Sequence, residues 1–228
     1  MTDEEHPPGI RQQRFTPPEG ATTIVLVRHG ESMPEHPDHP HPVRDGHGDP
    51  ELAPIGHDQA RKVAERLAAE HHGGQTIDAV YVTSLQRTHQ TAAPLVELIG
   101  VEPVEIAELR EVHLGDWEGE FRARVAAGDP IFIEMVDAQR WDVIPGAEPG
   151  EDFERRLRAG IERIVAASGG GRVVAVVHGG VIGQLIAMAT GAAGLAFSTA
   201  DNASISELVV MPNGVWRVRR YNDASHLS

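Results

Sequence analysis

Two histidines in this sequence follow apolar, β-branched runs and stand directly before glycine. His29 comes after residues 22–27 (TTIVLV) and one arginine, and His178 comes after residues 172–177 (RVVAVV). Such runs are typical of strands buried on both faces of a sheet. Ligands bind beyond the carboxyl ends of parallel strands, and a glycine there lets a ligand approach the backbone closely. The helix expected after His178 adds an N-terminus that favours anions. The pattern therefore indicates an anion site with histidines at its edge.

The elements that must position these histidines alternate along the chain. Strands are predicted over residues 22–27, 77–83, 104–107, 172–177, 205–210 and 215–221. Helical stripes of apolar residues cover 56–68, 85–99, 153–165 and 181–189, and residues 121–140 have a weaker helical pattern. Residues 33–50, rich in Pro, His, Asp and Gly, are expected to form an irregular loop.

This alternation predicts one α/β domain, a three-layer αβα sandwich around a mostly parallel sheet. The hairpin signal Pro212-Asn213-Gly214 makes that sheet mixed. Residues 1–20 hold four prolines and many charges, so we expect an extended N-terminal tail there. Residues 21–228 show no repeat and no linker, and we expect them to form a single domain.

Composition restricts the class of protein. The chain has 228 residues, of which 40% are hydrophobic and 24% charged, as in globular proteins. It has no cysteine, which excludes disulfides, thiolate metal sites and cysteine nucleophiles. The net charge of −14 repels nucleic acid and anionic membrane. No apolar run approaches the roughly 20 residues of a membrane span, and residues 1–20 do not form a secretory signal. We therefore expect a cytoplasmic protein without nucleic-acid or membrane partners.

Several motifs occur in a fixed order, and together they carry a family resemblance. They are Arg28-His29-Gly30-Glu31-Ser32 and residues 52–60, 84–92, 109–119, 145–148, 176–180 and 202–204. The sequence resembles the histidine phosphatase superfamily, also called the phosphoglycerate mutase-like family, over about residues 22–221. The resemblance implies the phosphoglycerate mutase-like fold and chemistry that needs no cofactor and no metal.

The resemblance also implies a role for each of five residues. His29 matches the nucleophile that forms a phosphohistidine, and its other ring nitrogen should donate to a backbone carbonyl. Arg28 and Arg87 match the phosphate-binding arginines, whose planar forks suit phosphate oxygens and disfavour a protonated His29. His178 matches the second phosphate-binding histidine, expected to be protonated and bound to the phosphoryl group. Glu111 matches the proton donor to the leaving oxygen.

Other acidic residues compete for the role of proton donor. The rivals in the same segment are Glu108, Asp116, Glu118 and Glu120. Glu148, in Pro145-Gly146-Ala147-Glu148, is expected to hold a backbone loop or an arginine.

The sequence departs from the family pattern near the first motif. Many members have a phosphate-contacting asparagine where this chain has Glu35, and Ala53 replaces a small hydroxyl residue. A carboxylate would repel phosphate, so we expect Glu35 to point elsewhere. Candidate substrate contacts are Ser32, Arg44 and Gly179.

The loop 33–50 is also rich in groups that can ligate metals. It contains His36, His39, His41 and His47 together with Asp38, Asp45 and Asp49. Prolines separate the histidines, which suits one tetrahedral site poorly, and we expect no metal there.

The leading functional hypothesis is a phosphomonoester hydrolase that acts on a small phosphorylated metabolite. The first alternative is a cofactor-dependent phosphoglycerate mutase. Residues 113–119 (HLGDWEG) favour the hydrolase because they are acidic and lack the longer, lysine-bearing segment of mutases. The second alternative, a non-catalytic phosphate-binding module, conflicts with the presence of all five key residues. A homodimer is left open, and the large side chains of Phe121, Phe132, Met135 and Trp141 either face the ligand or pack a subsidiary core.

Overall fold

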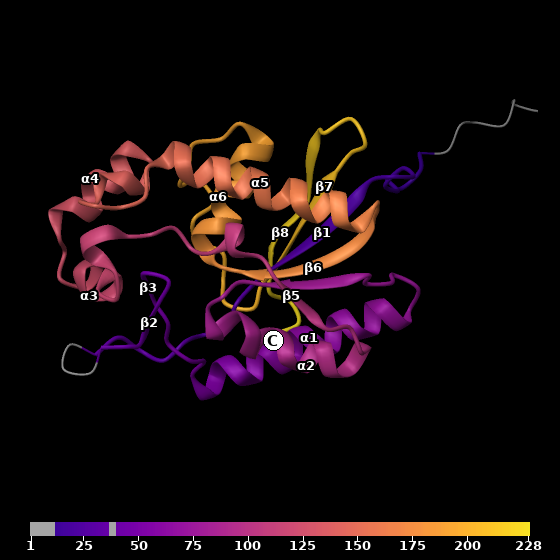
Figure 1. The fold of residues 1–228 in the computed structure, drawn as a ribbon, viewed down its shortest axis with the longest axis horizontal. Coiled ribbons are helices and arrows are strands. Elements are labelled where there is room, and N and C mark those ends of the chain that lie inside the picture. The colour runs from indigo at the N-terminus through magenta and orange to yellow at the C-terminus, as the bar shows by residue number, and fades with distance from the viewer. Residues whose placement is uncertain (1–11, 37–39) are drawn as a thin grey trace, which may run out of the picture.

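The computed structural model describes residues 12–36 and 40–228. Its main sheet has the strand order β5-β4-β6-β1-β7-β8, with β5, β4, β6 and β1 parallel and with β7 and β8 added in antiparallel fashion (Figure 1). The strands are β1 (Thr22–Arg28), β4 (Ala79–Val82), β5 (Pro103–Glu105), β6 (Gly171–Val177), β7 (Ile205–Val210) and β8 (Trp216–Asp223). The mostly parallel, mixed α/β sheet is the one predicted from the sequence.

Helices cover both faces of this sheet. They are α1 (Pro54–His72), α2 (Gln86–Ile99), α5 (Gly150–Ser168) and α6 (Gly179–Thr190). In Figure 1, α5 and α6 lie above the sheet, and α1 and α2 lie below it. Among the described residues, no helix is long and apolar enough to cross a membrane.

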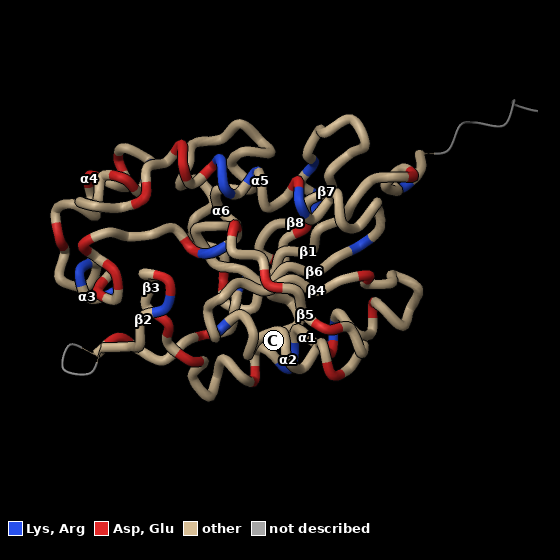
Figure 2. The backbone as a smooth tube through the Cα atoms, in the orientation of Figure 1, with Lys and Arg blue, Asp and Glu red and all other residues tan. Residues whose placement is uncertain are grey.

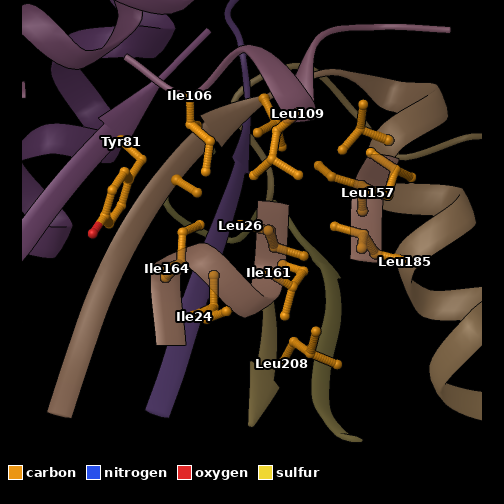
Figure 3. Packing of buried hydrophobic residues seen from close by; sticks show 14 of the residues in the cluster. Ile24, Leu26, Tyr81, Ile106, Leu109, Leu157, Ile161, Ile164, Leu185 and Leu208 are labelled. Atoms are coloured by element: carbon orange, nitrogen blue, oxygen red, sulfur yellow. The ribbon is translucent and has the colours of Figure 1, made fainter. Parts of the chain in front are cut away.

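The two apolar layers arise from the side-chain alternation of β1. Ile24 and Leu26 point to one face, where they pack with residues of α5 and α6 such as Ile161 and Leu185 (Figure 3). Val25 and Val27 point to the other face and belong to the cluster that contains residues of α1 and α2. Because successive strand residues face opposite sides, a run that is apolar at every position requires a layer of helix on each side.

The strands β1 and β6 are neighbours in register, which brings the two histidines together. Arg28 lies opposite Val177, and the backbone N–H of His29 donates to the carbonyl of Val177 at 2.9 Å. Both strands end at these residues, so the backbone leaves the sheet at the same edge after each of them. The register therefore fixes His29 beside His178.

A third, smaller cluster lies beyond this edge. It is built from Trp117, Met135, Ile144 and Leu195, with Phe132 packed against it. The helical segment expected over 121–140 is divided into α3 (Phe121–Ala126) and α4 (Pro130–Ala138). Short 3-10 turns lie outside this segment, at η1 (Ala107–Leu109), η2 (Gly115–Trp117) and η3 (Trp141–Val143). The division occurs at Gly128, which has φ of +69°, and Asp129 caps α4 by accepting from the N–H of Ile131 at 3.0 Å.

The expectation of an irregular loop over 33–50 is wrong in part. A short hairpin pairs β2 (Val43–Arg44) with β3 (His47–Gly48). Its turn residues Asp45 and Gly46 have φ of +52° and +82°, the backbone that a tight two-residue hairpin requires. Residues 37–39 of the same loop, and residues 1–11 of the expected tail, lie outside the described residues.

Candidate active site

A cavity of about 250 Å³ opens at the carboxyl edge of the sheet. Arg28, His29, Arg87 and Glu111 all line it. They come from the last residue of β1 and from the segments that follow β1, β4 and β5, while the segment after β6 supplies His178. Four of the five residues that the resemblance singled out thus share one cavity, and the ring of the fifth, His178, lies 5.2 Å from that of His29.

The hydrogen bonds of His29 define its tautomer. Nδ1 lies 2.7 Å from the carbonyl oxygen of Gly30, which can only accept, so Nδ1 carries the proton. Arg87 Nε donates to Nε2 at 3.2 Å, so Nε2 carries the lone pair. The side chain is buried, and this burial, together with the charges of Arg87 and Arg28, holds the pKa of His29 well below its ordinary value. The expected backbone carbonyl partner is confirmed, and Nε2 is the unprotonated ring nitrogen.

The two arginines are held differently. Arg87, in the first turn of α2, is buried and donates to the carbonyl of Gly48 at 3.0 Å. Arg28 donates to the carbonyl of Ala200, while its Nε is buried with no partner among the described residues. Burial lowers the pKa of both guanidinium groups, and the nearby Glu111 charge opposes that shift. Both stay cationic, because an arginine pKa begins far above neutrality.

His178 occupies the N-cap position of α6 without a capping hydrogen bond from its side chain, and it is fully buried. Its Nε2 lies 3.0 Å from the hydroxyl of Thr83, its Nδ1 has no partner among the described residues, and its ring centroid lies 5.2 Å from that of His29. Burial and then Arg87 hold its pKa well below the ordinary value. Burial and the positive charge of Arg87 therefore favour the neutral imidazole, whereas the sequence led us to expect a protonated one.

The carboxylate of Glu111 lies against the first turn of α6. Its Oε2 accepts from the N–H of Gly180 at 3.2 Å, and its Oε1 accepts from the N–H of Val112 at 3.0 Å. A Cβ atom at position 180 would lie only 2.5 Å from Oε1, so this close approach requires glycine. The rival Glu118 also lines the cavity, but its two oxygens accept from the N–H groups of Leu114 and Gly48.

The backbone that carries Glu111 is held by residues that sequence reasoning missed. Arg156 donates to the carbonyls of Glu108, Arg110 and Glu111 at 2.6–2.8 Å. The same guanidinium forms a two-point ion pair with Glu148 at 2.6 and 2.7 Å. The expectation that Glu148 holds an arginine is confirmed, whereas nothing in the sequence marks Arg156 among the other arginines of α5.

The β2–β3 hairpin supports the same segment from the cavity side. His47 Nε2 donates to the carbonyl of Glu111 at 3.0 Å. The Asp45 carboxylate accepts from the Ser84 hydroxyl and from Arg110, both at 2.7 Å, and these bonds, led by that of Ser84, lower its pKa. The hairpin thus joins the segments after β4 and β5.

The predicted substrate contacts are only partly brought together. Ser32 and Gly179 line the cavity, whereas Arg44 is exposed on β2 and is not among the lining residues. Glu35 lines the cavity, but its Oε2 accepts from the N–H groups of Arg122 and Ala123 at 3.1 and 3.2 Å. As expected, that carboxylate oxygen is directed to the backbone of α3.

The outer wall of the cavity is partly aromatic. Phe121 and Trp141 line it with ring centroids 6.0 Å apart, whereas Phe132 and Met135 pack in the third cluster. Of the candidate metal ligands, Asp38 and His39 lie outside the described residues. Within the described part of the chain, no three His, Asp or Glu side chains are grouped to hold a metal.

Comparison with known proteins shows the family to which this chain belongs. The sequence profile of the histidine phosphatase superfamily (branch 1) matches residues 24–224. The chain belongs to the histidine phosphatase superfamily. It is 34% identical to phosphoglycerate mutase-like protein 4 of Arabidopsis thaliana, over 90% of this chain and 86% of the relative. It is 31% identical to the metal-independent phosphoserine phosphatase of Arabidopsis thaliana, over 91% of this chain and 84% of the relative.

Solved structures show the same fold. A phosphoglycerate mutase from Bacillus anthracis str. Sterne superposes with a TM-score of 0.73 at 25% identity, covering 92% of this chain and 96% of the mutase. A mycobacterial glucosyl-3-phosphoglycerate phosphatase in complex with inorganic phosphate gives a TM-score of 0.69 at 27% identity, covering 90% and 99%. The phosphoglycerate mutase-like fold predicted from the sequence is confirmed, and the family together with its phosphatase members supports a phosphatase enzyme.

Proposed function

We propose that this protein hydrolyses small phosphate monoesters through a phosphohistidine at His29. The arrangement of His29 carries the proposal: Nδ1 is hydrogen-bonded to a backbone carbonyl, and the unprotonated Nε2 accepts from Arg87 at the edge of a cavity that both His29 and Arg87 line. We further propose that residues 21–228 form the single catalytic domain.

The first half-reaction transfers the phosphoryl group to the protein. The Nε2 lone pair of His29 forms a bond to phosphorus while the bond from phosphorus to the ester oxygen breaks. Protonated Glu111 gives its proton to that departing oxygen, so an alcohol leaves. Arg28 and Arg87 stabilise the charge on the three equatorial oxygens.

The second half-reaction returns the enzyme to its starting state. The Glu111 carboxylate now accepts a proton from a water molecule as the water oxygen attacks phosphorus. The bond between phosphorus and Nε2 breaks, its electron pair returns to nitrogen, and inorganic phosphate leaves. One carboxyl group therefore serves as acid and then as base.

Two buried polar atoms support phosphate binding at this place. Arg28 Nε and His178 Nδ1 are buried and have no partner among the described residues. Leaving a buried polar group unpaired costs about 1–3 kcal/mol, so such atoms mark positions where a ligand supplies the missing bond. A phosphoryl group offers three oxygen acceptors.

The charges that line the cavity support hydrolysis over the mutase reaction. Three arginines (28, 87 and 122) stand with three glutamates (35, 111 and 118). A mutase must hold a doubly phosphorylated intermediate, which needs an excess of positive charge. The cavity of about 250 Å³ lies below the usual range for drug-sized ligands, which suits a small ester.

A rapid-quench experiment tests the proposal. Wild type, His29→Ala and the matched control His57→Ala, an exposed histidine of α1, are mixed with a phosphate-labelled ester and quenched. We expect label on wild type and the control, labile in acid and stable in base, and none on His29→Ala, whose turnover should fall at least about 10³-fold. Label retained by His29→Ala would refute the nucleophile. Label passed to a second hydroxyl of phosphoglycerate without release of inorganic phosphate would favour the mutase.

A further inference from the structure

Helix α3 carries two arginines in different surroundings. Arg124 forms ion pairs with Glu120 at 2.9 Å and with Asp129 at 3.5 Å. Within the described part of the chain, the guanidinium of Arg122 has neither an ion pair nor a hydrogen bond, and Arg122 lines the cavity. Figure 2 shows basic and acidic residues interspersed along α3, beside the β2–β3 hairpin.

The charge of Arg122 reaches the reaction centre. Burial is the main cause that lowers the pKa of His29, and the positive charge of Arg122 is among the further causes. The pKa of Arg28 is also lowered mainly by burial, with Arg122 among the further causes. The side chain of Arg122 is exposed to solvent, which weakens such a field, and its place in the lining of the same cavity supplies the geometric observation. Arg122 is therefore a third arginine of the cavity lining, and it is carried by α3.

The position of Arg122 is fixed from two sides. The carboxylate of Glu35 accepts hydrogen bonds from the backbone N–H of Arg122 at 3.1 Å and from the backbone N–H of Ala123 at 3.2 Å. Its neighbour Phe121 packs against Trp117 and Trp141, with ring centroids 6.0 Å apart in both pairs. The backbone is thus held while the side chain stays available to a ligand.

We propose that Arg122 binds a carboxylate on the leaving group, so that the substrates are small phosphorylated carboxylic acids. The proposal rests on the hydrolase function proposed above. Arg28 and Arg87 are engaged by the phosphoryl group, and Arg122 is the remaining arginine among the described residues that line the cavity. Its planar fork matches the two oxygens of a carboxylate. A second phosphate is disfavoured, because its larger charge would face Glu35 and Glu118 in the same lining.

Matched substrates test this assignment through release of inorganic phosphate. The first pair is 3-phosphoglycerate and glycerol 3-phosphate, which differ only by a carboxylate in place of a hydroxymethyl group. The second pair is O-phosphoserine and phosphoethanolamine, which differ only by a carboxylate. We expect wild type to prefer the carboxylate member of each pair by about 10- to 100-fold in kcat/KM.

Variants then assign the preference to one side chain. Arg122→Gln should lose about 10- to 100-fold on the two carboxylates, mainly through KM, and clearly less on their partners. Arg122→Lys should recover part of the loss because it keeps the charge. Arg124→Gln, the matched control on the same helix, should behave as wild type because its ion pairs lie outside the cavity.

The outcomes separate this inference from the function on which it rests. If nitrophenyl phosphate is hydrolysed but neither carboxylate is preferred, the role of Arg122 is refuted and the hydrolase stands. The role of Arg122 is refuted in the same way if Arg122→Gln weakens both members of each pair equally, or if 2,3-bisphosphoglycerate is preferred over 3-phosphoglycerate. Absence of phosphate release from every ester would overturn both proposals.

Discussion

Replacing Gly180 with alanine should displace the Glu111 carboxylate without unfolding the protein. The added Cβ would lie 2.5 Å from Oε1, whereas real Cβ contacts essentially never fall below 3.0 Å. The carboxylate must therefore shift by at least about half an ångström, and it loses the alignment of its bond to the N–H of residue 180.

The size of the effect follows from the role of a general acid. A misplacement of about 1 Å costs roughly 10²-fold in rate, and the whole contribution of a general acid is about 10²–10⁴-fold. We expect a loss of about 10- to 100-fold in kcat/KM on an alkyl phosphate. Nitrophenyl phosphate should lose less, because its leaving oxygen needs little protonation.

A control and a cycle separate displacement of the acid from general damage. Gly150→Ala changes the first residue of α5, where the added Cβ would make only an ordinary contact at 3.7 Å, and it should leave both activities unchanged. In a Glu111→Gln background, Gly180→Ala should add little further loss, because both changes act on one group. Melting temperatures of all variants should stay within about 4 °C of wild type, which corresponds to roughly 1 kcal/mol for a chain of this size. Equal losses on the alkyl and aryl esters would refute the reasoning.

Three further predictions follow from the same contacts. The nucleophile acts unprotonated, and the pKa of His29 in the protein without substrate lies well below 6.5, so kcat/KM should be retained as pH falls to about 6.5 and be lost only as pH falls through that lower value. A pH profile of kcat/KM that already declines as pH falls from 8 to 7 would contradict this. Arg156→Gln should lower the free energy of unfolding by about 2–4 kcal/mol, because it leaves three loop carbonyls and a carboxylate without their donor. The loss should appear as a lower denaturation midpoint in urea. The control Arg155→Gln, on the exposed face of α5, should change this midpoint little. The hydrogen bond from Arg66 depresses the pKa of Asp223, so this pair stabilises the fold above pH 3.8, and the stabilisation is lost as pH falls through the depressed value. In thermal melts, Asp223→Asn should therefore be less stable than wild type at pH 7. The difference in melting temperature should shrink below pH 3.8.

The sequence by itself determined the central sheet and the identity of the residues at its edge. Apolar runs such as residues 22–27 can be buried only between two layers, and a helix ends where Gly100 and Gly169 adopt left-handed backbone as C-caps. The position of His29 and His178 directly after two such runs follows from local pattern alone. These features were predictable because each depends on residues close together in the chain.

The tertiary structure alone decided how the site is supported. Arg156 reaches the carbonyl of Glu111 across 45 residues, and His47 reaches the same carbonyl across 64. Many arginines of this chain have similar local surroundings in the sequence, so nothing there distinguishes the one that holds the backbone of Glu111. Such contacts depend on how separate elements pack.

The two arginines of α3 show the same division most clearly. Arg122 and Arg124 are two positions apart on one short helix, with glutamates before them in the sequence. Residues two apart on a helix point in different directions, but which of the two faces the cavity depends on how α3 is seated. Glu35 and the aromatic contacts of Phe121 fix that seating. The local sequence supplies two cations, and the packing of α3 turns one of them toward the cavity, where it can meet a substrate.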